Sequence, residues 1–150
     1  MTVTRRHFLM RAVVVALAAG GAGGEAAAQP DEDRVEYFQA VIGDQVFFAG
    51  GRLDLDRAAK AILDRQIGWL KRHDAFRITL EGHTDERGTG EYCLSVSERR
   101  AVVVKTYMVA HGITPGRILT VGYGKFRPLD EGHTEAAWAR NRRVVTRVER

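Results

Sequence analysis

The chain has 150 residues, of which 45% are hydrophobic and 28% are charged. This composition is typical of a folded globular protein and excludes a wholly disordered or fibrous chain. The formal net charge is +4, but residues 1–28 hold three arginines and one glutamate, which leaves 20 Lys and Arg against 18 Asp and Glu in the remainder. The two signs are interspersed, so we expect no surface for binding nucleic acid.

Residues 1–28 have the pattern of an export signal. Arg5 and Arg6 stand before a short apolar run, AVVVALAA, and the segment ends in a small-x-small pattern that predicts Gln29 as the mature N-terminus. The double arginine favours a twin-arginine signal, with an ordinary Sec signal as the alternative. The apolar run is shorter than the roughly 20 residues that a membrane-spanning helix needs.

The segment after the signal begins with polar residues and continues into a strand and a helix. Residues 29–43 are predicted to be a linker or irregular lead-in, and residues 44–150 to form one domain. DQVFF (44–48) is apolar and aromatic, as in a strand. A helix is predicted from Asp56, which can cap it, to about His73. Its apolar stripe consists of Ala59, Ile62, Leu63, Ile67 and Leu70.

Three further strands and a second long helix are predicted in the remainder. FRITL (76–80), RILTVGYG (117–124) and RVVTRV (143–148) have strand patterns. The helix is predicted over 91–110 and is expected to end there, because a glycine and a proline follow it. One helical turn is expected near 136–140. The inward stripe of the long helix consists of Val96, Arg100, Val103, Val104 and Tyr107.

This order of elements, βαβαββ, predicts an α/β fold: an α+β sandwich in which two main helices pack on a mixed four-stranded sheet. Cys93 is the only cysteine, so no disulfide can form within the chain and the hydrophobic core alone must stabilise the fold.

The most polar loop, EGHTDERGTGEY (81–92), joins the second strand to the long helix. Asp85 lies where the chain leaves the strand, and Arg100 lies 15 positions later on the inward stripe. A buried arginine needs an anion. The two residues could form an internal salt bridge. Alternatively, Asp85 could accept an ammonium group and Arg100 a carboxylate from one zwitterionic ligand. Spacing alone does not decide between these alternatives.

Metal binding and catalysis are less favoured by the same loop. His83, Asp85 and Glu86 are possible metal ligands, but no second ligand pair stands at a recognised spacing, so no metal is expected. Cys93 could act as a nucleophile beside His83, although a lone cysteine is more often a small buried hydrophobe. Clustered loop carboxylates are usually solvated, so we expect neither an enzyme nor a cofactor.

Three stretches resemble the OmpA-like peptidoglycan-binding domain family: EGHTDERGTGEY…SERRA, VGYGKFRP and GHTEAAWARNRRV. They occur in the family's order and spacing, and the likeness, nearest to the peptidoglycan-associated lipoprotein branch, extends from about Gln45 to Val148. The resemblance implies the family's βαβαββ fold. It also implies non-catalytic binding of the cell wall through the diaminopimelate side chain of the stem peptide.

The resemblance also assigns site residues. Asp85 matches the aspartate that holds the diaminopimelate ammonium, and Arg100 matches the arginine that holds its carboxylate. Thr89 and Val96 match further lining positions, and Gly51 stands where a ligand-contacting aspartate is expected. Residues 141–144, NRRV, match a stretch that we interpret as tying the last strand to the site.

Two other departures from the family pattern concern cysteine. Cys93 replaces a signature asparagine at the start of the long helix, and no cysteine precedes it that could carry a lipid anchor. We therefore expect an exported, periplasmic protein that associates with the cell wall or outer membrane without an evident anchor. Alternative functions are a Tol–Pal-type interaction module with a TolB-like partner and an enzyme that acts on the wall.

Overall fold

The computed structural model describes residue 31 and residues 33–150. The predicted export signal, with its twin-arginine pattern, lies outside the described residues. The elements in chain order are α1 (Val35–Tyr37), η1 (Phe38–Gly43, a π-helix), β1 (Gln45–Phe47), α2 (Arg57–Arg72), β2 (Arg77–Gly82), α3 (Gly90–Ala110), η2 (Pro115–Arg117, a 3₁₀ helix), β3 (Ile118–Gly122), α4 (Glu135–Asn141) and β4 (Arg143–Glu149).

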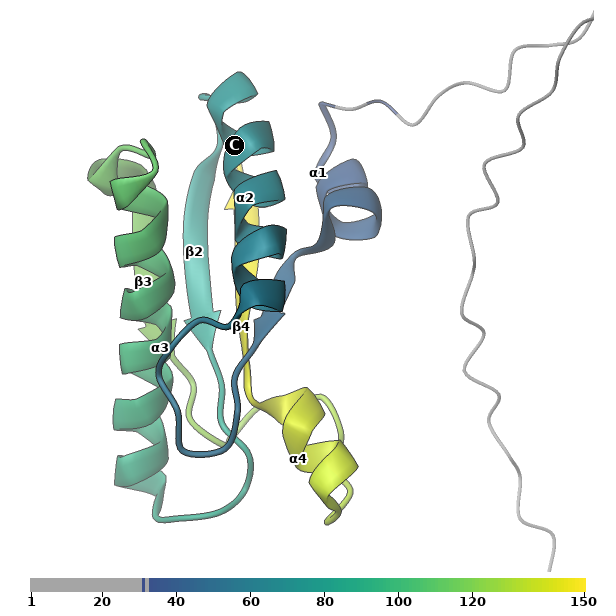
Figure 1. Ribbon diagram of the computed structural model, residues 1–150, viewed down its shortest axis with the longest axis vertical. Coiled ribbons are helices and arrows are strands. Elements are labelled where there is room, and N and C mark those ends of the chain that lie inside the picture. The colour runs from purple at the N-terminus through teal and green to yellow at the C-terminus, as the bar shows by residue number, and fades with distance from the viewer. Residues whose placement is uncertain (1–30, 32) are drawn as a thin grey trace, which may run out of the picture.

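The strands form one mixed sheet in the order β1-β4-β2-β3. β4 pairs antiparallel with both β1 and β2, and β2 pairs parallel with β3. Figure 1 shows α2 and α3 side by side on one face of this sheet, with α4 at its lower end. The predicted fold class, two main helices on a mixed four-stranded sheet, is confirmed.

Helix α2 begins and packs as its sequence predicts. Asp56 accepts a hydrogen bond from the Ala59 backbone N–H at 2.8 Å, which caps the helix. Four residues of the predicted stripe are buried and Ile62 is partly buried. Trp69 on the same helix is fully buried and packs against Phe38 and Phe76, with ring centroids 5.0 and 5.1 Å apart.

The segment before β1 differs from the prediction. Residues 35–43 are helical rather than an irregular lead-in, and Phe38 is fully buried in the core. Gln66 fixes the end of η1, because its side-chain amide donates to the Gly43 carbonyl at 2.7 Å. The expectation of an irregular segment was therefore wrong for residues 35–43, because Phe38 is fully buried and Val35, Tyr37 and Ile42 pack, partly buried, against the same core.

Two glycines bring α3 into close contact with the sheet. Gly82 and Gly122 are paired across β2 and β3, and both face Ser97. A Cβ atom on Gly82 would lie 1.9 Å from the Ser97 carbonyl oxygen, and one on Gly122 would lie 2.7 Å from the Ser97 hydroxyl. Only glycine therefore permits this approach, which places the first turns of α3 next to the end of β2.

The buried face of α3 is turned slightly from the predicted stripe. Arg100 and Val104 are buried as predicted, whereas Val96, Val103 and Tyr107 are only partly buried. The buried residues of α3 are Cys93, Ser97, Arg100, Ala101, Val104 and Met108. None of the helices in the described part of the chain is long and apolar enough to cross a membrane.

Candidate ligand-binding cleft

A cleft of about 390 Å³ opens at the end of the sheet where β2 leads into α3. Its walls come from the loop after β1, the loop after β2, the first turns of α3 and the segment from α4 to β4. The lining residues are Gly50, Gly51, Thr84, Asp85, Arg87, Tyr92, Cys93, Val96, Arg100, Glu135 and Arg142.

Asp85 is a buried carboxylate with cationic partners at both oxygens. It accepts hydrogen bonds from the Arg87 backbone N–H at 3.0 Å, from Arg87 Nε at 3.2 Å and from Arg87 Nη2 at 2.8 Å. Arg142 Nη1 donates to the same carboxylate at 3.1 Å. Burial acts to raise the pKa of Asp85, but these hydrogen bonds outweigh burial and hold the pKa below its usual value.

Arg100 is a buried cation that contacts only neutral groups. Its side chain is 2% exposed and donates to the carbonyls of Arg52 (3.2 Å), His83 (3.2 Å) and Ala49 (3.5 Å). No carboxylate of the described residues lies within 4.0 Å of its guanidinium. Burial lowers the pKa of Arg100, and the charge of Arg142 adds to this effect, while Asp85 opposes it.

The internal Asp85–Arg100 salt bridge, one of the two alternatives left open by spacing, is not formed. Asp85 pairs with Arg87 and Arg142 instead. Arg100 is therefore left with N–H groups beside the cleft, because a guanidinium has five and only three are donated to carbonyls.

Arg142 is a cleft-lining side chain to which the sequence assigned no individual role. It is 6% exposed and donates from Nε to the Phe48 carbonyl at 2.9 Å, from Nη1 to Asp85 and from Nη2 to Glu135 at 3.1 Å. It thus joins three walls of the cleft. The predicted tie between the NRRV stretch and the site is consistent with this arrangement, but the contact with Asp85 spans 57 positions and has no local signal.

The other predicted site residues occupy different places. Gly51 and Val96 line the cleft, and Gly51 has a φ of 65°. Thr89 is the N-cap of α3: its hydroxyl accepts from the Tyr92 backbone N–H at 3.2 Å, and it is not among the lining residues. Its role as a ligand contact stays a prediction.

Cys93 is buried and its thiol donates to the Arg87 carbonyl at 3.3 Å, so it holds the loop at the start of the helix.

The rim of the cleft is tied to α4 by a second set of contacts. Glu86 accepts from the Trp138 indole N–H and contacts His133 Nδ1, both at 2.8 Å, and the Arg87 guanidinium lies 4.4 Å from the centre of the Trp138 ring. The Glu86 carboxylate raises the pKa of His133, and the hydrogen bonds from Trp138 and His133 lower the pKa of Glu86. These contacts hold Arg87 over the cleft.

Glu81, near the C-terminal end of β2, and His83, just after the strand, support the strand end that leads into the loop. Glu81 pairs with Arg147 at 2.9 Å, and the backbone of His83 contacts both Arg143 and Arg100. Within residue 31 and residues 33–150, no group of three or more His, Cys, Asp or Glu side chains is arranged to hold a metal ion.

The sequence of this domain matches the family model described as the OmpA family over residues 47–142. The chain belongs to the OmpA family. Relatives of this OmpA-family chain include the peptidoglycan-associated lipoprotein of Rhizobium meliloti (strain 1021), 40% identical over 129 residues, which are 86% of this chain and 72% of the relative. The protein of the same name from Pseudomonas aeruginosa is 54% identical over 98 residues, covering 65% of this chain and 58% of that protein.

Solved structures give the same result. The peptidoglycan-associated lipoprotein from Burkholderia pseudomallei superimposes with a TM-score of 0.71 at 31% identity, over 74% of this chain and 96% of that one. The cell wall anchor of the T6SS from Pseudomonas aeruginosa has a TM-score of 0.59 at 24% identity, covering 68% of this chain and 76% of that one; at this identity the likeness concerns the fold alone.

Proposed function

We propose that this OmpA-family domain binds peptidoglycan without catalysis, through the side chain of diaminopimelate in the stem peptide, and so contributes to the organisation of the cell envelope. That side chain carries an ammonium group and a carboxylate on the same carbon. Arg100 would receive the carboxylate and Asp85 the ammonium. The names of the relatives, which are peptidoglycan-associated lipoproteins, support the wall as the target.

The observation that carries this proposal is the isolated charge of Arg100. A guanidinium buried inside a protein normally has an anionic partner, because loss of hydration is costly. Arg100 has only carbonyl partners, yet it lines an open cleft. A carboxylate entering the cleft would supply the missing charge, and the planar fork of the guanidinium suits that group.

The ammonium group would have to share or replace a partner at Asp85. Arg142 is buried and is held at three points, whereas the side chain of Arg87 is 49% exposed. The Arg87 guanidinium is therefore the partner that can leave. Its backbone N–H can keep its own bond to the carboxylate while the ammonium takes the place of the side chain.

The remaining parts of the proposal follow from the target. A protein that binds the wall must be exported, and the pattern in residues 1–28 predicts an export signal. We place the protein in the periplasm, associated with the wall or the outer membrane. Without the aspartate expected at Gly51, the ammonium would lack one carboxylate contact of the family pattern, so we expect affinity to be modest.

Sedimentation with diaminopimelate-containing sacculi tests the proposal. The purified wild-type chain should pellet with the sacculi, and Asp85→Asn and Arg100→Met should stay in the supernatant. Arg99→Met is the matched control, because Arg99 is exposed on the same helix and does not line the cleft. It should pellet like the wild type. A thermal unfolding curve for each variant separates loss of binding from loss of folding.

A protein partner of the TolB type is the second candidate function. Tyr92, Leu94 and Phe126 are large apolar side chains with exposed fractions of 59%, 41% and 62%. A Cβ on Gly90 would lie 3.0 Å from the Phe126 ring, so this ring lies against the start of α3 beside the cleft that Tyr92 lines. Exposed aromatic side chains favour a protein contact. If the wild type does not pellet with sacculi, this candidate leads, and Tyr92→Ala should then weaken capture of the partner.

A further inference from the structure

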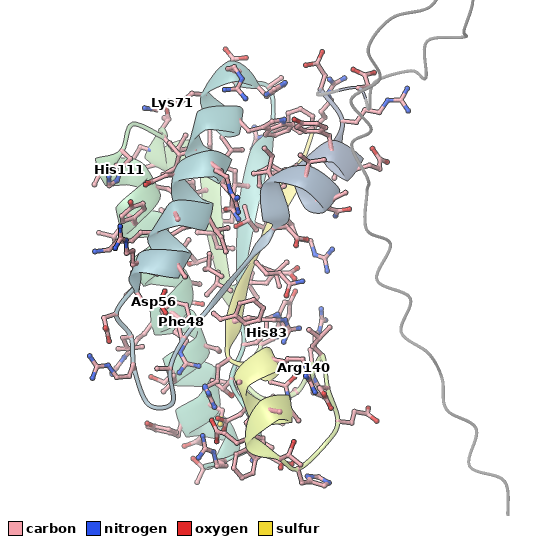
Figure 2. All side chains as sticks on the ribbon, turned by 45° about the vertical axis from the view of Figure 1, so that its right-hand side comes forward. Phe48, Asp56, Lys71, His83, His111 and Arg140 are labelled. Carbon is pink, nitrogen blue, oxygen red and sulfur yellow. The ribbon has the colours of Figure 1, made fainter. Side chains whose placement is uncertain are left out.

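A second cleft, of about 420 Å³, lies on the face of the sheet opposite α2 and α3. Alternate residues of a strand point to opposite faces. The helix-facing set includes Leu80, Gly82 and Val144, whereas this cleft is lined by Glu81, His83, Arg143 and Arg147 from the same two strands. Figure 2 shows His83 beside β4, on the side of the strand away from α2.

The cleft contains more positive than negative charge. Three guanidinium groups line it, those of Arg127, Arg143 and Arg147, against the carboxylates of Asp44 and Glu81. Arg147 and Glu81 pair at 2.9 Å. Neither Arg127 nor Arg143 has a carboxylate within 4.0 Å among the described residues. Arg127 instead lies over the Tyr123 ring, 3.8 Å from its centre.

Arg143 is the buried cation of this cleft. It is 6% exposed, and its two terminal nitrogens make only long hydrogen bonds, 3.3 Å to the Asn141 carbonyl and 3.4 Å to the Arg127 carbonyl. Its Nε has no partner among the described residues. Burial lowers the pKa of Arg143, because the charged guanidinium is less stable away from water.

His83 is a second buried group with unsatisfied nitrogen atoms. It is 3% exposed, and neither ring nitrogen has a hydrogen-bond partner among the described residues. Burial lowers its pKa from 6.5 to about 4, and the charges of Arg143, Arg127 and Arg147 add to this effect. The imidazole is therefore neutral at pH 7 and still has one N–H to donate. Buried polar groups are normally satisfied, so two such groups in one cleft indicate a missing ligand.

We propose that this cleft is an anion site that binds one phosphate group, with Arg143 and His83 at its buried end and Arg127 at its open end. Phosphate suits it because guanidinium groups bind its oxygens in pairs, and a tetrahedral anion can accept from several donors at once. This cleft is separate from the proposed wall-binding cleft, because the two share no lining residue. The phosphate could be free or carried by a lipid headgroup.

This proposal can be tested by nuclear magnetic resonance. The wild-type chain is titrated with inorganic phosphate at constant ionic strength. The ring signals of His83 and the Nε–H signal of Arg143 should shift saturably. The pKa of His83 should rise on binding, because a nearby anion stabilises the imidazolium. The proposal would be overturned if these signals showed no saturable shift up to roughly 50 mM phosphate, which is about the weakest binding of interest.

Two exposed arginines provide a matched pair of variants. Arg127→Gln removes a cleft guanidinium from a surface loop, and Arg77→Gln removes the same charge from the same face of β2 outside the cleft. Loss of one charge-assisted contact should weaken phosphate binding about tenfold in Arg127→Gln. Arg77→Gln should change it less than about twofold. If both variants weakened phosphate binding equally, the binding would depend only on general surface charge, and the proposal would be overturned.

Vesicles distinguish the source of the phosphate. The wild-type chain is mixed with phosphatidylcholine vesicles that do or do not contain phosphatidic acid, with and without free phosphate. Sedimentation that requires phosphatidic acid and is blocked by free phosphate supports a headgroup. A response to inorganic phosphate without sedimentation supports a free anion. In both cases Arg127→Gln should retain binding to sacculi, which separates this site from the proposed wall function.

Discussion

Replacement of Arg142 by methionine tests whether the cleft depends on a buried ion pair. The side chain of Arg142 is 7% exposed and that of Asp85 is 9% exposed. Methionine fills a similar volume but removes the hydrogen bonds to Asp85, Glu135 and the Phe48 carbonyl. Both Asp85 and the Phe48 carbonyl would then lose a partner inside the protein.

The expected destabilisation follows from these contacts. Breaking a buried ion pair by removing one partner costs roughly 3–5 kcal/mol. Asp85 keeps its contacts with Arg87, so we expect a value at the low end, about 3 kcal/mol. Domains of this kind are stable by about 5–15 kcal/mol, so the variant should still fold at 25 °C.

Urea unfolding followed by circular dichroism measures this effect. With an m-value of about 2 kcal/mol/M, the midpoint should fall by about 1.5 M. Arg140→Met is the matched control, because Arg140 is an exposed arginine two positions earlier whose partner is Asp130. Its midpoint should hardly move. Equal midpoints for the two variants would refute the claim that the Asp85 pair stabilises the cleft.

Three further predictions follow from the geometry. Gly82→Ala should destabilise the fold by about 3 kcal/mol in urea unfolding, because the new methyl group would lie 1.9 Å from the Ser97 carbonyl oxygen. Gly116→Ala is the control and should be nearly neutral, because its methyl group would lie within 4 Å of no atom beyond its chain neighbours. Gly51→Asp, compared with the uncharged Gly51→Asn, should tighten binding of a diaminopimelate peptide several-fold by calorimetry, because it adds a second carboxylate beside the ammonium. The pKa of His83 is lowered from 6.5 to about 4, so between these pH values the unfolded chain binds more protons than the folded one. The free energy of unfolding should therefore fall by up to about 3 kcal/mol as the pH drops from 6.5 to 4. His83→Gln should remove the contribution of His83 to this pH dependence.

Elements with local signals could be predicted from the sequence, and those fixed by distant contacts could not. The cap at Asp56 and the apolar stripe behind it predict α2 to within one residue at each end. Helix η1 was missed because its stability depends on Phe38 packing against Trp69, 31 positions away. Residues 35–43, VEYFQAVIG, are mostly apolar, but the segment is too short for its periodicity to indicate such a contact.

The same distinction holds for the candidate site. Asp85, Val96, Arg100 and Gly51 line the cleft and Thr89 does not, while the role of all five as ligand contacts stays a prediction. The partners of Asp85 were not foreseen, because Arg142 reaches it from the junction of α4 and β4, and Arg87 turns back onto it within the loop. Charge and spacing could suggest that Arg100 needs an anion, but only the arrangement of side chains leaves it without a carboxylate partner.

The most direct test of the central claim is calorimetry of the wild-type chain with two stem tripeptides that differ in one group. One ends in diaminopimelate and the other in lysine, which lacks the side-chain carboxylate proposed to meet Arg100. The diaminopimelate peptide should bind at least about tenfold more tightly, and Arg100→Met should abolish this preference. Equal affinity of the wild type for the two peptides would contradict the account.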